Sequence, residues 1–359
     1  MSELLNRIKS AGTIKSTSIL SESHFFNEKD QVSTDVPIIN VALSGKLDGG
    51  LTSGLTFIAG ASKHFKSLLG LLLVKAYMKK YPDAICLFYD SEFGITPEYI
   101  QSNGIDASRV IHAPIEHIEQ LKFDISKRLE EIKRGDKVII FMDSVGNLAS
   151  KKEVEDALEG KSAADMTRAK TLKSLFRIVT PHLTTKDIPC VVVNHTYMEQ
   201  SLYPKAIMSG GTGPMYSANT VFIIGKSQEK DGTEIVGWNF TINIEKSRFV
   251  KEKSKLPFLV TYDGGINKWS GLLDIAIDNG SVKKPSNGWY SRVDMDTGDI
   301  ESKKWRASET NCKEFWLPLL SSKKFYDAVK NEYQVTTSRM LSDDAIERLL
   351  NQNEDEDYE

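Results

Sequence analysis

The stretch Leu55-Thr-Phe-Ile-Ala-Gly60-Ala-Ser-Lys-His-Phe-Lys66-Ser67 decides how the rest of the chain is interpreted. Its first five residues form a short apolar run, which is typical of a buried strand. A glycine, five further residues and Lys-Ser follow, and this is the spacing of a phosphate-binding loop between a strand and a helix. Backbone N–H groups cradle phosphates in such loops, and the following helix directs the positive end of its dipole at them.

Each part of this loop has an expected role in holding a nucleotide. Lys66 would reach the β- and γ-phosphates, and Ser67 would hold Mg²⁺ through its hydroxyl. Phe65 stands where the motif has glycine, so a positive φ there would cost about 1–2 kcal/mol of strain. A plain strand–turn–helix is the alternative for the motif taken alone. The expected nucleotide-binding residues are Gly60, Ala61, Ser62, Lys63, His64, Phe65, Lys66 and Ser67.

Strands and helices are predicted to alternate between residue 36 and about residue 262. Short apolar runs recur at 85–89, 109–112, 137–142 and 190–194, and apolar residues at helical spacing fill 118–132 and 172–183. Gly135 closes the first of these helices. This alternation predicts parallel pairing in a doubly wound α/β sheet. From Thr220 onward, consecutive runs at 221–224, 238–244 and 257–262 predict an antiparallel extension.

Polar side chains follow the predicted parallel strands, at the edge where open α/β sheets bind ligands. Asp143 ends the run Val-Ile-Ile-Phe-Met and is expected to help hold Mg²⁺, with a turn cap as the alternative. Glu92 follows the second run and is the candidate that orients or deprotonates an attacking water, because phosphoryl transfer depends on positioning and charge neutralisation. Otherwise Glu92 is a solvated surface residue.

Composition limits the class of protein. The 359 residues are 40% hydrophobic, enough for a core, and the longest apolar run, Leu68 to Val74, is far shorter than a membrane helix. The N-terminus lacks a secretory signal pattern. The cysteines, Cys86, Cys190 and Cys312, are odd in number and widely separated, which argues against a disulfide framework or a zinc site. We therefore expect a soluble, cytoplasmic protein without a membrane partner.

The net charge of −3 is unevenly distributed along the chain. Residues 343–359 hold eight acidic residues and one basic residue, a net of −7, which leaves +4 for residues 1–342. A basic body with an acidic tail recurs in proteins that bind nucleic acid, where the tail competes with phosphates. A solubilising terminus is the alternative.

Taken together, these motifs resemble the RecA-type recombinase family, most closely the UvsX type of tailed phages. Residues 32–51 resemble the family's lead-in to its phosphate loop, and residues 60–67 resemble the UvsX-type loop, which also lacks glycine before lysine. Residues 90–99 are similar to the segment that carries the catalytic glutamate, here Glu92, and the aromatic residue that stacks on adenine, here Tyr99. The similarity continues through residues 287–290 and 305–307, so it covers nearly the whole chain.

The resemblance implies a RecA-like P-loop ATPase core with ATP and Mg²⁺ as cofactors. It implies an N-terminal oligomerisation segment (1–40), the core with two DNA-binding loops (41–270), a small C-terminal domain (271–342) and an acidic tail (343–359). The N-terminal segment would dock on an adjacent subunit, with Ile19, Leu20, Phe25 and Phe26 as anchors.

The same resemblance assigns two segments to DNA. Residues 150–165 match the family's first DNA-binding loop, followed by a DNA-contacting arginine, and residues 196–214 match the second loop, whose glycine run we expect to be too flexible for a core. Cations, amides and aromatic faces hold a single strand without sequence preference. Mobile surface loops are the alternative. The expected DNA-binding side chains are Lys151, Lys152, Lys161, Arg168, Tyr197, Tyr203 and Lys205.

Three further residues acquire roles from the family. His195 stands where the family carries a polar γ-phosphate sensor, although the bacterial protein has glutamine there and a satisfied core histidine is the alternative. Lys246 and Arg248 match two basic residues that reach the ATP of the neighbouring subunit, with a solvated basic strand as the alternative. The implied catalytic set is Glu92, Lys66, His195, Lys246 and Arg248.

The expected function is that of an ATP-dependent DNA recombinase. It would form filaments on single-stranded DNA, pair with homologous double-stranded DNA and exchange strands in recombination, repair and replication. A single-strand-binding protein, a mediator and a helicase are the partners implied by the resemblance. A ring-forming helicase or loader is one alternative, and a non-catalytic DNA-binding paralogue is another. The long second loop argues against the first, and the set Lys66, Ser67, Glu92 and Asp143 argues against the second.

Overall fold

The computed structural model describes residues 3–14, 17–23, 29–161 and 167–335. Within these residues, one large sheet has the strand order β10-β9-β8-β7-β1-β5-β4-β2-β3, and a short strand, β6, also pairs with β5. The first five strands are β1 (Gly54–Gly60), β2 (Ile85–Asp90), β3 (Val110–Pro114), β4 (Val138–Asp143) and β5 (Pro189–Met198). The others are β6 (Ala206–Met208), β7 (Thr220–Asp231), β8 (Glu234–Ser247), β9 (Lys255–Thr261) and β10 (Gly265–Ile266).

The strand order confirms a mostly parallel sheet with an antiparallel extension, with one correction. The sequence pattern assigns β7 to the extension, but β7 pairs in parallel with β1 from Thr56↔Thr220 to Gly60↔Ile224. Antiparallel pairing begins between β7 and β8. Local patterns cannot reveal this, because a strand's neighbour depends on how distant parts of the chain pack.

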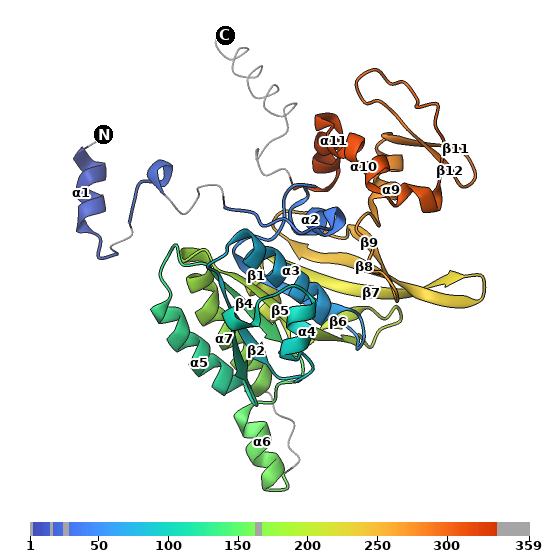
Figure 1. The fold of residues 1–359 in the computed structure, drawn as a ribbon. Helices are drawn as coiled ribbons and strands as arrows, with labels where there is room; N and C mark the ends of the chain where they lie inside the picture. The colour runs from blue at the N-terminus through green and yellow to red at the C-terminus, as the bar shows by residue number, and fades with distance from the viewer. Residues whose placement is uncertain (1–2, 15–16, 24–28, 162–166, 336–359) are drawn as a thin grey trace, which may run out of the picture.

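Helices cover both faces of the sheet (Figure 1). The helices α2 (Pro37–Ser44) and α3 (Lys66–Lys80) pack in one core cluster, and α5 (Ile118–Glu131) and α7 (Thr167–Thr185) pack in the other. Alternate residues of β1 pack into the two clusters. The Phe57 ring lies 5.1 Å from the ring of Phe176 in α7, whereas Ile58 packs in the cluster on the other face. Both periodic segments in the sequence are therefore helices.

A close approach of α3 to the sheet fixes where its first turn lies. A Cβ on Gly70 would come within 2.4 Å of Cε2 of Phe141 in β4, so only glycine lets the helix pack this closely. The helix begins at Lys66, directly after β1 and its loop. Its N-terminus is thereby held at the carboxyl edge of the parallel strands.

The two segments assigned to DNA contain regular structure where they are described, and residues 162–165 of the first segment lie outside the described residues. Residues 151–158 form α6 (Lys151–Leu158), where the Ser150 side chain caps the helix in a reciprocal box with Glu153. The second segment forms a hairpin of β5 with β6, followed by α8 (Thr212–Ser217). The expectation that its glycine run is too flexible for a core is wrong at Gly213, which is buried and where a Cβ would lie 2.7 Å from Lys173 Cβ.

The C-terminal unit packs on the main core rather than standing apart (Figure 1). Its elements are α9 (Leu272–Asp278), β11 (Val282–Ser286), β12 (Trp289–Arg292), β13 (Trp305–Arg306), α10 (Lys313–Leu320) and α11 (Lys323–Tyr333). Phe315, Trp316 and Phe325 belong to the same apolar cluster as α2 and α3. The unit is therefore continuous with the half of the core that contains α2 and α3.

The N-terminal segment behaves differently along its length. Helix α1 (Glu3–Ala11) lies away from the rest of the chain and has no buried residue, and Leu20 is also exposed (Figure 1). From Val32 onward the chain is part of the main core. The expected anchors Phe25 and Phe26 and the acidic tail lie outside the described residues. In the part of the chain that is described, no helix combines the length and apolarity needed to cross a bilayer.

Candidate nucleotide and DNA site

The carboxyl ends of the parallel strands meet at one edge of the sheet. In the register of the strands, Gly60 lies opposite His195 and Asp90 lies opposite Asp143. A pocket of about 310 Å³ opens at this edge. The functional side chains that line it are Lys66, Ser67, Glu92, Tyr99, Asp143 and His195.

The loop between β1 and α3 adopts the strained backbone that its sequence suggests. Phe65 has φ 60° and ψ 15°, in the left-handed region, and Lys63 also has φ 60°. Lys66 is buried, and its Nζ donates to the Ala61 carbonyl at 2.7 Å. Burial lowers the pKa of Lys66, opposed by the charges of Asp143 and Glu92.

Asp143 and Ser67 together offer oxygen ligands for a cation. Asp143 is 3% exposed and accepts a hydrogen bond from the Ser67 side chain. Burial raises the pKa of Asp143 to about 6, and the neighbouring charges of Glu92 and Asp90 add to the effect while Ser67 and Lys66 oppose it. A hydroxyl beside carboxylates in an electron-rich pocket is the donor set that suits Mg²⁺, so the residues fit this ion.

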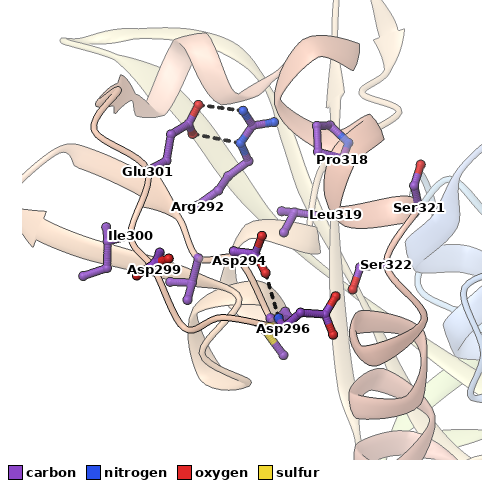
Figure 2. Close-up of a pocket in the computed structure, with 12 residues that line it drawn as sticks. Arg292, Asp294, Asp296, Asp299, Ile300, Glu301, Pro318, Leu319, Ser321 and Ser322 are labelled. Atoms are coloured by element: carbon purple, nitrogen blue, oxygen red, sulfur yellow. Dashed lines mark hydrogen bonds and ion pairs between the residues drawn. The ribbon is translucent and has the colours of Figure 1, made fainter.

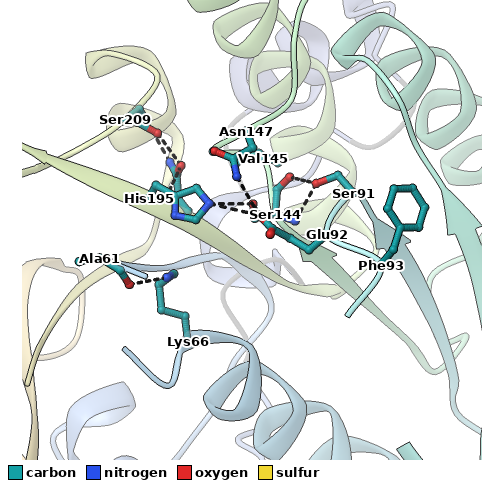
Figure 3. A network of polar contacts seen from close by, with 12 residues as sticks. Ala61, Lys66, Ser91, Glu92, Phe93, Ser144, Val145, Asn147, His195 and Ser209 are labelled. Carbon is teal, nitrogen blue, oxygen red and sulfur yellow. Dashed lines mark hydrogen bonds and ion pairs between the residues drawn. The ribbon is translucent and has the colours of Figure 1, made fainter. Parts of the chain in front are cut away.

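Glu92 is the centre of a hydrogen-bond network (Figure 3). Its Oε1 accepts from Ser144 Oγ at 2.7 Å, from Asn147 Nδ2 at 3.2 Å and from His195 Nε2 at 3.2 Å. Partial burial would raise the pKa of Glu92, but the hydrogen bonds from Ser144 and His195 and the charges of His195 and Lys66 outweigh it and lower the pKa. The carboxylate is therefore held ionised and oriented.

Residues that the sequence analysis does not single out build the turn that carries Glu92. Asp90 Oδ1 accepts from the backbone N–H groups of Glu92 and Phe93 at 3.0 and 2.8 Å. Ser91 Oγ donates to the Ser144 carbonyl at 2.6 Å. Asp90 could have been found from its place at a strand end, whereas Ser91, Ser144 and Asn147 carry no sequence signal for this contact.

His195 connects Glu92 to the second DNA segment. The carbonyl of His195 accepts from the Ser209 N–H at 2.9 Å, and Asn194 Oδ1 accepts from Ser209 Oγ at 2.8 Å. A Cβ on Gly146 would come within 2.3 Å of His195 Cδ2, so glycine leaves room for the ring. A movement of Glu92 would thus reach the segment after β6 through two hydrogen-bonded steps.

The lysines of the first DNA segment are engaged with carboxylates. Lys151 pairs with Glu155 at 3.5 Å, Lys152 pairs with Asp156 at 3.2 Å, and Lys161 contacts Glu159. Residues 151–161 hold three lysines and four carboxylates. Helix α6 therefore does not present a simple basic surface.

Arg168 supports the backbone beside the Glu92 network. Its Nε donates to the Leu148 carbonyl at 2.8 Å, and its Nη2 donates to the carbonyls of Val145 and Gly146 at 3.2 and 2.5 Å. These carbonyls flank Asn147, which donates to Glu92. In this arrangement the Arg168 guanidinium positions the loop after β4 instead of facing solvent for DNA.

The second DNA segment exposes large aromatic groups. Tyr197 and Tyr203 are 52% and 79% exposed, and Lys205 is also exposed, all at the turn end of the β5–β6 hairpin. Exposed aromatic rings beside a cation are the combination on which single-stranded bases stack.

Lys246 and Arg248 lie at the opposite end of β1 from its phosphate loop. Lys246 pairs in register with Val221, and its Nζ donates to the carbonyls of Met215 and Tyr216 at 2.8 and 3.2 Å. The Arg248 N–H donates to the Asn219 carbonyl, next to the start of β1. Burial and the charge of Arg248 lower the pKa of Lys246. Neither residue joins the pocket of its own chain.

A second pocket, of about 490 Å³, lies in the C-terminal unit (Figure 2). Arg292 there forms a bidentate pair with Glu301, with Nη2–Oε1 at 2.7 Å. Asp294, Asp296 and Asp299 line the pocket and would repel phosphates. These carboxylates make the pocket unsuited to the phosphates of a nucleotide.

Comparisons with known proteins cover both units of the chain. Residues 5–267 match the family model of the RecA N-terminal domain, and residues 269–329 match that of the C-terminal domain of the bacteriophage T4 recombination and repair protein. The chain is 55% identical over 357 residues to the recombination and repair protein of Enterobacteria phage T4, covering 98% of this chain and 91% of that protein. It is 25% identical over 266 residues to Protein RecA of Acinetobacter baylyi, covering 73% of each. The resemblance inferred from the motifs is confirmed.

We predict that Asp143→Asn stabilises the fold near neutral pH. An aspartate with a pKa of about 6 in the fold and 3.8 as the ordinary value binds its proton more tightly when folded. Its contribution to stability therefore falls as the pH rises through this window, by up to about 3 kcal/mol. Urea unfolding at pH 4.5 and pH 7.5 should show that the stability advantage of the Asp143→Asn variant over the wild type is larger at the higher pH.

Asp124→Asn is the matched control, because hydrogen bonds from Arg128 and Tyr89 outweigh partial burial and lower the pKa of Asp124. This variant should lose stability at the higher pH. If the difference in unfolding free energy between the wild type and Asp143→Asn stays constant across the pH range, ionisation of Asp143 does not destabilise the fold.

Proposed function

The chain belongs to the RecA family of DNA recombinases, and we propose that it uses ATP and Mg²⁺ to assemble on single-stranded DNA and exchange strands with a homologous duplex. It acts in DNA recombination and repair. The observation that carries the proposal is the hydrogen-bonded connection from Glu92 through His195 to Ser209, which joins the nucleotide pocket to the second DNA segment. Recombination-dependent replication is part of the same proposal.

The nucleotide would bind with its phosphates at the N-terminus of α3. Lys66 would exchange its bond to the Ala61 carbonyl for bonds to phosphate oxygens. Ser67 and Asp143 would hold Mg²⁺, which neutralises phosphate charge when bound. Tyr99, at the rim of the pocket, would stack on the adenine.

Glu92 would act on the attacking water. Its lowered pKa keeps it ionised, and the three bonds to Oε1 fix its orientation. Because phosphoryl transfer needs positioning more than covalent help, one oriented carboxylate suffices to place or deprotonate the water. The chain is then a DNA-dependent ATPase, since DNA bound at the second segment would bias His195 and so Glu92. The ionised, anchored Glu92 argues against a non-catalytic paralogue.

Two surfaces would meet DNA. Tyr197, Tyr203 and Lys205 of the hairpin would stack with and neutralise the single strand, while Lys151, Lys152, Lys161 and Arg168 would contribute only where they exchange their present partners. The C-terminal unit exposes cations that would attract the duplex. These are Lys283, Lys284, Lys303, Lys304 and Arg306.

The remaining partners follow from the family. Copies of the chain would form a helical filament, with the exposed apolar residues Leu4 and Ile8 of α1 docking on a neighbour. A single-strand-binding protein, a mediator and a helicase would act with the filament. A cytoplasmic location suits Cys86 and Cys190, which are buried free thiols.

We predict that Glu92→Gln slows ATP hydrolysis by about 10²–10⁴-fold while ATP and DNA binding stay within about threefold of the wild type. The amide keeps the shape and an acceptor oxygen but loses the charge that acts on water. Hydrolysis on single-stranded DNA and nucleotide binding are measured side by side. Glu98→Gln, on the exposed start of α4 (Pro97–Ser102), is the matched control and should hydrolyse normally. Normal turnover in Glu92→Gln would remove this residue from the chemistry.

We also predict that each ATPase site is completed by Lys246 and Arg248 of the neighbouring subunit. They lie at the far end of β1 from their own loop, and cations that reach a γ-phosphate across an interface stabilise its transition-state charge. Lys66→Ala subunits and Lys246→Ala/Arg248→Ala subunits should each be inactive alone and regain hydrolysis when mixed on single-stranded DNA. A co-assembled mixture that stays inactive would show that the cations do not act between subunits.

A further inference from the structure

The phosphate loop contains two residues in a conformation that side chains disfavour. Lys63 and Phe65 both have φ 60°, and neither is glycine. Each such residue strains the backbone, and the conformation persists only where the surrounding structure holds it. The loop must therefore be stabilised from outside.

The ring of Phe65 rests on a pair of phenylalanines from the antiparallel extension. Its centroid lies 5.2 Å from that of Phe240 in β8 and 5.9 Å from that of Phe258 in β9. Phe240 and Phe258 lie directly opposite each other in register, with their rings stacked at 5.5 Å. Both are almost fully buried. Ring contacts of this kind stabilise beyond burial alone, and the two that Phe65 makes oppose its backbone strain.

The preceding residue is fixed to the same half of the sheet. His64 Nδ1 lies 2.7 Å from the Ile224 carbonyl, and because a carbonyl only accepts, the ring nitrogen is the donor. Ile224 in turn lies opposite Gly60. Two consecutive loop residues thus contact β7, β8 and β9 immediately before Lys66 begins the helix.

We propose that Phe65 is a positioning residue for nucleotide binding: seated on the Phe240–Phe258 pair, it holds the phosphate loop and Lys66 in their binding conformation. In other phosphate loops a glycine adopts this backbone conformation freely, whereas here the packing of Phe65 holds it. Because the loop is already ordered, it loses less conformational entropy than a glycine loop would when phosphate binds. The inference rests on the proposed function, in which this loop binds ATP.

The test compares Phe65→Gly, Phe65→Ala and Phe240→Leu in the full chain without DNA, by calorimetric titration with Mg·ATPγS and by urea unfolding. Phe65→Gly relieves the strain but frees the loop, so it should be more stable than Phe65→Ala yet bind the nucleotide about tenfold more weakly than the wild type. Phe240→Leu, which lies outside the loop, should weaken binding several-fold in folded protein. In steady-state hydrolysis, the KM for ATP should rise by a larger factor than kcat falls, because the loop binds the ground state and the transition state alike.

Phe176→Leu is the matched control, since Phe176 is equally buried on the other face of the sheet. It should lose stability without losing nucleotide affinity. If Phe65→Gly binds as tightly as the wild type or more tightly, glycine would serve equally well and the proposal fails. It also fails if Phe65→Gly and Phe240→Leu affect stability alone.

Lys66→Ala separates this proposal from the function on which it rests. Loss of binding in Lys66→Ala with normal binding in Phe65→Gly would overturn only the role of Phe65. Normal binding in Lys66→Ala would overturn the nucleotide site itself.

Discussion

Three carboxylates, Asp90, Glu92 and Asp143, gather at one edge of the sheet, and the ammonium of Lys66 interacts with the charges of Glu92 and Asp143. Parallel strands bring these groups together, and burial makes the excess negative charge unfavourable, as the raised pKa of Asp143 records. A bound divalent cation would relieve this stress, and triphosphate charge would in turn be met by Lys66 and the helix dipole. Binding of the cation and the nucleotide would thus stabilise this part of the fold.

Strand β1 lies between the two halves of the molecule that would respond to the nucleotide. On one side, β5 carries His195 and continues into the hairpin with Tyr197 at its exposed end. On the other side, β7 leads to β8 and β9, which hold Phe65 against their phenylalanine pair and carry Lys246 towards the far edge. A change at the phosphate loop would therefore reach the β5–β6 hairpin through hydrogen bonds, and the strand that carries Lys246 through packed rings.

The sequence was sufficient for the features that depend on local patterns. The strand–loop–helix around Lys66, the strand ends at Asp143 and His195, and the positive φ at Phe65 were predictable because each follows from spacing or residue type. Other features depend on contacts between distant segments. The placement of β7 beside β1, the bond from Ser144 to Glu92, and the register of Phe240 with Phe258 have no local signature. The helix after Ser150 was predictable, since Ser150 and Glu153 form a capping-box pattern and Lys151 pairs with Glu155 at helical spacing, but the family's loop assignment concealed it.

We infer that DNA at the β5–β6 hairpin would control hydrolysis at Glu92 through His195. The most direct measurement is ATP hydrolysis at saturating Mg·ATP with and without single-stranded poly(dT), for the wild type and for His195→Ala. We expect DNA to raise the wild-type rate roughly tenfold or more, and His195→Ala to bind Mg·ATPγS and DNA but to lose this stimulation. Equal wild-type rates with and without DNA would show that DNA does not control hydrolysis. Full stimulation in His195→Ala would show that His195 does not connect the hairpin to Glu92.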